Sequence, residues 1–145
     1  MESPILFYHI NKQFGFLSNF SVHPIILNDK IWATSEHYFQ AMKFVGTPFE
    51  EKIRLAHSPS EAARIGRDRN LPLRLDWELV KIDVMRIALE AKFEQHPELM
   101  QNLLATKNAE IIEHTTNDSF WGDGGDGSGK NMLGILLMEL RAKSH

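Results

Sequence analysis

The segment Trp121–Asn131 constrains the fold more than any other part of the chain. It contains five glycines, two aspartates, one lysine and one asparagine in eleven residues. Glycine adopts positive φ angles and allows close approach to the backbone, but it loses more conformational entropy on folding than other residues. A hydrophobic core does not need this composition. The segment therefore favours a loop shaped to meet a ligand, and the simpler alternative is a flexible surface turn.

Length and charge limit the possible classes of protein. The chain has 145 residues, enough for one domain with a hydrophobic core, and we expect one domain over residues 1–145. The net charge of −3 gives no general attraction to a polyanion. Non-specific binding of DNA or membranes is therefore not expected, whereas a nucleotide-sized anion needs only a local basic patch.

The absence of cysteine excludes disulfides, thiolate catalysis and cysteine-based zinc sites. The first residues lack the basic and apolar regions of a signal peptide, and no apolar run reaches membrane-spanning length. We therefore expect a cytoplasmic protein without a membrane partner. The sequence does not indicate the oligomeric state.

The hydrophobic pattern predicts an α+β fold, which is a compact, mainly helical domain with a small β-sheet. Ser35 and Ser60 are expected to cap helices. Leu79, Val84 and Ile87 belong to the face with which the longest helix is expected to wall the core. The expected strands are 5–9, 24–27, 30–32 and 111–112, and the expected helices are 36–45, 49–57, 61–66, 77–94, 97–105 and 132–141.

Glu36, Gln40 and Lys43 form a polar stripe on the first expected helix. They are spaced at i, i+4 and i+7, so their side chains lie along one side of the helix. The common explanation of such a stripe is a solvated face with a weak ion pair. A binding site is the alternative, because aromatic residues on both sides of the stripe are unlike the surroundings of a solvated face.

Two familiar ligand sites do not fit the glycine-rich segment. A P-loop needs Ser or Thr after its lysine, where this chain has Asn131, and Asp126 would repel a bound polyphosphate. A calcium-binding EF-hand needs a glutamate at its twelfth position, which is absent. The seven histidines show no H-x-x-x-H pair, and His37 is expected to lie in the core. We therefore predict no metal and no organic cofactor.

A sugar suits the segment better. Carboxylates such as Asp123 and Asp126 accept hydrogen bonds from ribose hydroxyls, and exposed backbone N–H groups bind phosphate. Trp121 can stack on a base. Glu36 and Asp126 are a candidate carboxylate pair that would stabilise an oxocarbenium-like transition state. The turn Gly66–Arg69 offers two arginines that could bind a phosphate or simply face solvent.

Several blocks together resemble the YbiA-like family, also called the NADAR domain, over essentially the whole chain. These blocks are Trp32–Phe44, Gly66–Arg69, Lys92–His96, Glu113–Thr115 and Trp121–Asn131. The resemblance implies a YbiA-like fold and N-glycosidic chemistry on ribosylated substrates. The implied substrates are ribosylaminopyrimidine phosphates of the riboflavin pathway or ADP-ribosylated guanine, in which case ADP-ribosylated nucleic acid is also a candidate.

We therefore predict an N-glycosidase, with a non-enzymatic ADP-ribose or nucleotide-binding module as the alternative. Glu36, Lys43 and Asp126 are the predicted catalytic residues. Lys43 would either attack the anomeric carbon or only pair with Glu36 or a phosphate. The glycine-rich segment is expected to fold over the first helix. The predicted substrate-binding residues are Asn19, Phe20, Trp32, Gln40, Arg67, Trp121, Asp123, Gly124, Gly127 and Asn131.

Overall fold

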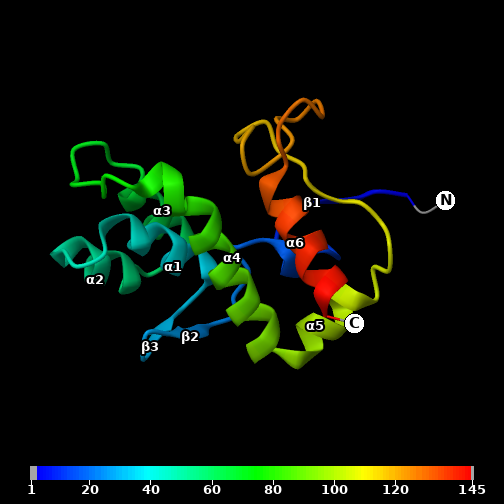
Figure 1. Cartoon of the computed structure of the whole chain (residues 1–145), viewed down its shortest axis with the longest axis horizontal. Coiled ribbons are helices and arrows are strands. Elements are labelled where there is room, and N and C mark those ends of the chain that lie inside the picture. Colours follow the sequence, from blue (N-terminus) through cyan, green and yellow to red (C-terminus); the bar gives the residue numbers. More distant parts are fainter. Residues whose placement is uncertain (1–2, 145) are drawn as a thin grey trace. The chain divides into compact units, whose positions relative to one another are not determined.

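The computed structural model describes residues 3–144 and has an α+β fold (Figure 1). The chain divides into two units. Unit 1 combines the chain up to Ser21 with the chain from His96 onward, and unit 2 is Val22–Gln95. Each unit has its own two-stranded sheet, so the single small sheet expected from the sequence is replaced by two.

Unit 1 is built on a parallel strand pair. β1 (Ile5–Phe7) pairs with β4 (Ile111–Glu113), so that the two ends of the chain meet in one sheet. α6 (Met132–Lys143) packs on β4 through the predicted leucine face. Leu133, Leu136, Leu137 and Leu140 are all buried, which confirms that prediction. The unit also contains a short 3-10 helix, η1 (Gly15–Leu17), and α5 (Pro97–Leu104).

Asn131 closes the edge of β4 that β1 leaves open. Its side-chain amide donates to the Ile111 carbonyl at 2.9 Å and accepts from the Glu113 N–H at 3.0 Å. One amide therefore replaces the donor and the acceptor that a third strand would supply. Asn131 also has a positive φ of 53° directly before α6, a conformation that asparagine tolerates better than most residues.

Unit 2 begins with the predicted hairpin. β2 (Ile25–Leu27) and β3 (Lys30–Trp32) pair antiparallel, and Asn28 and Asp29 both have positive φ in the turn, as a type I′ turn requires. The Gln95 amide bonds both the N–H and the carbonyl of Ile26, at 2.8 and 2.9 Å. A side-chain amide thus completes a strand edge in this sheet too.

The helices of unit 2 are close to those expected. They are α1 (Ser35–Ala41), the 3-10 helix η2 (Met42–Phe44), α2 (Pro48–Arg54), α3 (Pro59–Gly66) and α4 (Trp77–Gln95).

Both predicted helix caps were wrong. Thr34 rather than Ser35 caps α1, because its hydroxyl accepts the His37 N–H. Ser58 rather than Ser60 caps α3, where Pro59 occupies the first helical position, which needs no N–H. In both helices the serine that was expected to cap lies inside the first turn.

The buried face of α4 differs from the predicted one. Leu79 is 84% exposed and Ile87 is 43% exposed, so these two residues do not belong to the core. The buried positions follow the 3.6-residue period from Trp77 through Val84 and Ala88, with Met85, Leu89 and Lys92 beside them. Lys92 is fully buried, and burial lowers the pKa of its amine to about 7.

Candidate active site

The polar stripe on α1 is buried rather than solvated. Glu36 is 6% exposed and Gln40 is 4% exposed. The Gln40 amide donates to the Glu36 carboxylate, with 2.7 Å between Nε2 and Oε2. A buried carboxylate needs polar partners to offset lost hydration, and Gln40 supplies one. This burial contradicts the solvated alternative and favours a functional role for the pair.

Gly66, the last residue of α3, allows this pair to form. A Cβ atom at this position would lie 2.8 Å from the Gln40 Cδ and 2.9 Å from its Cβ, well inside ordinary contact distance. The Gly66 carbonyl also accepts a hydrogen bond from the Lys43 amine at 3.1 Å. A residue without a side chain therefore contacts two of the three residues of the stripe, Gln40 and Lys43.

The amine of Lys43 lies beside a packed pair of aromatic rings, whose centres are 5.1 Å apart. Its Nζ is 6.0 Å from the centre of the Phe39 ring and 5.9 Å from the Trp77 ring. Burial lowers the pKa of the Lys43 amine below its ordinary value, which the negative charge of Glu36 opposes and the positive charge of Arg67 reinforces. A larger share of the amine is therefore unprotonated near neutral pH than for a lysine in water.

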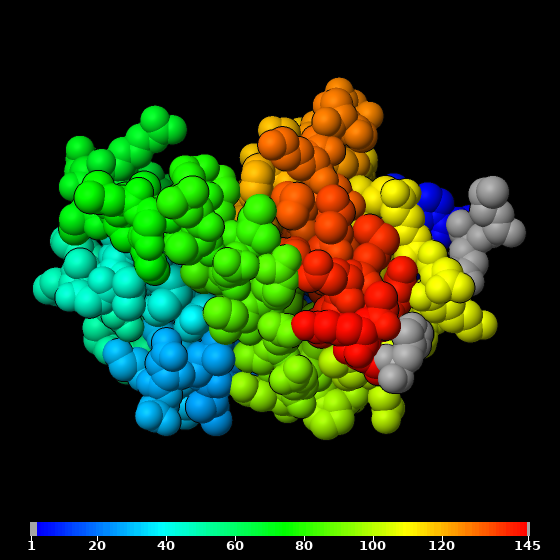
Figure 2. Space-filling view, viewed as in Figure 1, coloured from blue at the N-terminus to red at the C-terminus, as the bar shows by residue number. Residues whose placement is uncertain are grey.

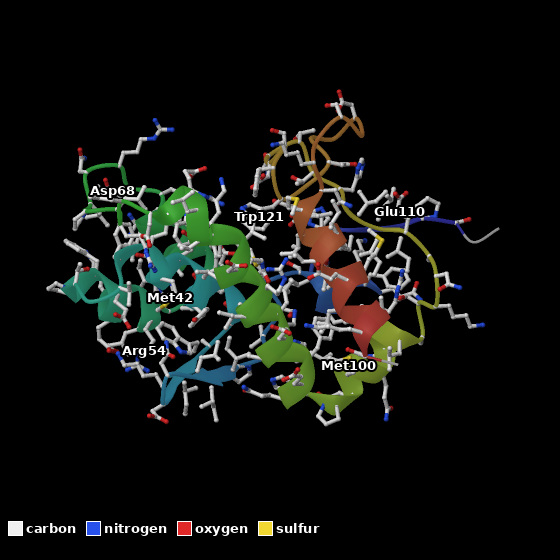
Figure 3. The ribbon with its side chains drawn as sticks, in the orientation of Figure 1. Met42, Arg54, Asp68, Met100, Glu110 and Trp121 are labelled. Carbon is white, nitrogen blue, oxygen red and sulfur yellow. The ribbon has the colours of Figure 1, made fainter. Side chains whose placement is uncertain are left out.

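Lys43 lines a pocket of about 550 Å³. This volume lies within the range of small-molecule sites. Three of the pocket's charged lining residues, Arg67, Asp68 and Arg69, lie on the turn that follows α3, where Asp68 is labelled in Figure 3; Lys43 on η2 and Glu78 on α4 also line it. The lining residues are Lys43, Phe44, Gly66, Arg67, Asp68, Arg69, Leu71, Leu73, Trp77 and Glu78.

Arg74 fixes one wall of the pocket. Its N–H donates to the Lys43 carbonyl at 3.0 Å, and its guanidinium bonds both carboxylate oxygens of Asp76 at 2.6 and 3.0 Å. The same guanidinium reaches the Met42 carbonyl at 3.4 Å. The segment from Leu71 to Trp77 is therefore tied to the backbone of the residue that carries the amine.

Most backbone N–H groups of the glycine-rich loop in unit 1 donate hydrogen bonds within the protein. Gly124 donates to the Asp118 carbonyl, Lys130 to the Ser119 carbonyl and Asn131 to the Gly122 carbonyl. The other N–H groups that bond within the loop are those of Gly125, Gly127, Ser128 and Gly129. The expectation that these groups are open to a phosphate was therefore wrong, because folding of the loop uses them.

Asp123 organises this loop. Its carboxylate accepts the N–H groups of Thr115 and Gly125, at 3.1 and 2.8 Å, and pairs with the His114 ring at 2.8 Å. Although burial acts to raise it, the pKa of Asp123 is lowered by these donors. The sequence analysis did not predict His114 as a site residue, although it directly precedes Thr115 in one of the blocks that carried the family resemblance.

Asp126, in contrast, is exposed at the tip of the loop. Its carboxylate accepts the N–H of Ser128 at 3.0 Å and the hydroxyl of the same residue at 2.6 Å. These bonds lower the pKa of Asp126, so the group is a carboxylate at neutral pH. Trp121 is partly buried against Phe120, with 4.9 Å between ring centres (Figure 3).

Two predicted substrate-binding residues have structural roles instead. Trp32 is fully buried, and its indole N–H donates to the Leu27 carbonyl at 3.0 Å, so it belongs to the core of unit 2. The amide of Asn131 is occupied by β4, as described above. His37 is a core residue as expected, because its ring bonds the Thr34 hydroxyl and the Ala56 carbonyl.

The structure brings some of the remaining predicted residues together. Glu36, Gln40, Lys43 and Arg67 cluster in unit 2 around the amine and its pocket. Asn19, Phe20, Trp121, Asp123, Gly124, Asp126 and Gly127 lie in unit 1. The pairing of Glu36 with Asp126 therefore stays a prediction.

Two broader properties concern the part of the chain between residues 3 and 144. It contains no group of three or more His, Asp and Glu side chains that could hold a metal ion. None of its helices combines the length and the apolar character needed to cross a membrane.

Comparison with known proteins places the chain among named relatives. The family model described as the NADAR domain matches residues 6–144. N-glycosidase YbiA of Escherichia coli is 58% identical over 140 residues, which cover 97% of this chain and 88% of that protein. An N-glycosidase of Nostoc punctiforme is 44% identical, with coverage of 94% and 90%. The NMR structure of Escherichia coli YbiA superimposes with a TM-score of 0.90 at 57% identity, covering 97% of this chain and 84% of that one.

Proposed function

The chain belongs to the NADAR family, and from this premise we propose that it is an N-glycosidase that hydrolyses the bond between ribose and a base. Relatives that are named N-glycosidases match nearly their whole length to this chain. A riboflavin biosynthesis protein of Vibrio vulnificus is 43% identical, although the match covers only 38% of that protein. These names favour a ribosylaminopyrimidine phosphate as the substrate, with ADP-ribosylated guanine as the other candidate.

The observation that carries the proposal is the environment of Lys43. Its amine faces a pocket, has a lowered pKa and lies close to the buried carboxylate of Glu36. A desolvated amine is a nucleophile near neutral pH, and a fixed carboxylate can accept or donate a proton beside it. An ordinary binding module needs neither group in this state.

In the covalent route, the unprotonated amine of Lys43 attacks the anomeric carbon of ribose. The N-glycosidic bond breaks and the base leaves with one amine proton; the bond between the anomeric carbon and the ring oxygen then breaks, and the second amine proton moves to that oxygen, which opens the sugar to an imine. Water then adds to the imine and releases the free sugar and the amine. In the direct route, Lys43 stays charged and a carboxylate activates water for attack on the same carbon.

The other predicted residues have binding roles in this proposal. Arg67 and Arg69 would hold the phosphate at the mouth of the pocket, since guanidinium groups bind phosphate bidentately. Asp126 instead stays a predicted catalytic residue, whose carboxylate would stabilise the oxocarbenium-like transition state. The substrate would be a small ribosyl phosphate or ADP-ribosyl compound in the cytoplasm, and residues 1–145 would form one NADAR domain.

The test is a panel of N-glycosides with mass detection of the released base. The panel contains a ribosylaminopyrimidine phosphate, NAD and ADP-ribosylated guanine. We expect release from at least one compound and loss of release in Lys43→Met, an uncharged side chain of similar length. Binding without release from all three compounds would replace the enzyme with a nucleotide-binding module.

The two routes are separated by borohydride reduction during turnover. The covalent route predicts a reduced sugar adduct on Lys43, detected by peptide mass spectrometry. Turnover without an adduct would establish the direct route. Asp126→Asn tests the loop: unchanged kcat and KM would remove Asp126 from the site.

A further inference from the structure

The pocket in unit 2 has two chemically different walls. Arg67, Asp68 and Arg69 on the turn after α3 carry charge, whereas Leu71, Leu73 and Trp77 form an apolar wall. Residues of both walls lie at the surface of unit 2, where the segment 67–76 is drawn in green (Figure 2). A ligand that fills the pocket therefore meets both charged side chains and apolar side chains.

The apolar wall is fixed before any ligand arrives. Arg74 lies between Leu73 and Leu75 and ties the segment to the carbonyls of Lys43 and Met42. Trp77 is only 5% exposed and packs on Phe39, with 5.1 Å between ring centres. Because both ends of the wall are held, its apolar groups lie at a defined position beside the amine.

Leu73 leaves apolar surface in contact with water at this position, which is unfavourable. It remains 48% exposed although it lines the pocket. Apolar surface at this place contributes favourable binding free energy only when a ligand covers it and removes it from water. The phosphate and the hydroxyl groups of a ribosyl phosphate cannot use this surface, because their hydrogen bonds need polar partners. The flat, uncharged base of the same substrate can.

We propose that Leu71, Leu73 and Trp77 form the subsite for the base, and that Leu73 determines which bases are accepted. The proposal rests on the N-glycosidase function and adds the orientation of the substrate. The base lies on the apolar wall, the phosphate lies at Arg67 and Arg69, and the anomeric carbon between them faces Lys43.

Two variants and two ligands test this orientation by binding measurements. The ligands are a ribosylaminopyrimidine phosphate and ribose 5-phosphate, which lacks the base. Leu73→Ala should weaken binding of the ribosylaminopyrimidine phosphate about tenfold and leave binding of ribose 5-phosphate unchanged. Arg67→Ala should weaken both ligands. Leu75→Ala is the matched control, since this leucine is fully exposed in the same segment and does not line the pocket.

The outcomes separate this proposal from the proposed function. If Leu73→Ala weakens neither ligand, or weakens both equally, the base does not lie on the apolar wall, whatever the activity of the enzyme. If wild-type protein binds both ligands but releases no base, the proposed N-glycosidase function is wrong. The effect of Leu73→Ala on binding of the two ligands still shows whether the base lies on the apolar wall. If Leu75→Ala weakens binding of the ribosylaminopyrimidine phosphate as much as Leu73→Ala does, the loss of binding does not arise in the pocket and the proposal is overturned.

Discussion

Gly66→Ala tests the proposed site at a residue that makes no contact through a side chain of its own. The added Cβ would lie 2.8 and 2.9 Å from two carbons of Gln40, where ordinary contact begins at 3.4 Å. The Gln40 side chain must therefore move away from residue 66 by at least half an ångström. Its hydrogen bond to Glu36 and the contact of Lys43 with the Gly66 carbonyl are then both disturbed.

The expected change in stability is small because two effects oppose each other. Overpacking of a buried site costs about 1–3 kcal/mol, whereas alanine is better than glycine in a helix by about 1 kcal/mol. The net loss of about 0–2 kcal/mol leaves the protein folded. Activity should fall much further, by about a hundredfold in kcat, since displacement of a catalytic group by about 1 Å has effects of that size.

Gly46→Ala is the control for this experiment. Gly46 is in the same unit, has a φ of +82° and has no atom within 4 Å of the position that an added Cβ would take. Alanine in this conformation costs about 1–2 kcal/mol without displacing Gln40. Thermal unfolding and steady-state kinetics of both variants would be compared. If Gly66→Ala keeps the wild-type kcat, or loses no more than Gly46→Ala does, the proposed role of the Glu36–Gln40 pair is wrong.

Three further predictions concern pH and stability. In the covalent route, kcat/KM should rise with pH through the lowered pKa of Lys43, because the neutral amine attacks; a pH profile that falls over this range contradicts the route. For Lys92 the native pKa is about 7 and the ordinary value is 10.5, so the unfolded state binds more protons between these values and stability should rise with pH there. Urea unfolding should show a rise of up to about 1.4 kcal/mol per pH unit that Lys92→Met lacks. Asn131→Leu leaves the Ile111 carbonyl and the Glu113 N–H without their amide partner and should cost about 2–4 kcal/mol, whereas a change in thermal unfolding below about 0.5 kcal/mol would show that water replaces the amide.

Much of the local structure could be predicted from the sequence. The hairpin followed from apolar runs around Asn28 and Asp29, and the leucine face of α6 followed from its spacing. The helix caps were missed by one or two residues, because adjacent Thr and Ser residues are equally capable of capping. Only the backbone conformation selected Thr34 and Ser58.

The glycine-rich loop shows where sequence reasoning failed. Its glycines were expected to leave N–H groups open for a phosphate. The structure uses their positive φ angles at Gly124, Gly125 and Gly127 to turn the chain, so that most of these groups bond within the loop. Composition predicts that such a backbone can turn tightly. It does not predict where the hydrogen bonds of the folded loop go.

The sequence by itself determined the family, the α+β class and the alignment of Glu36, Gln40 and Lys43 on one helix, since these depend on residue type and local spacing. Tertiary structure decided that the stripe is buried, that Gly66 lies against Gln40, and that Trp77 and Leu73 line the pocket. Burial and pocket lining arise from packing between segments that are far apart in the chain. Helical periodicity shows which side chains share a face, but not what covers that face.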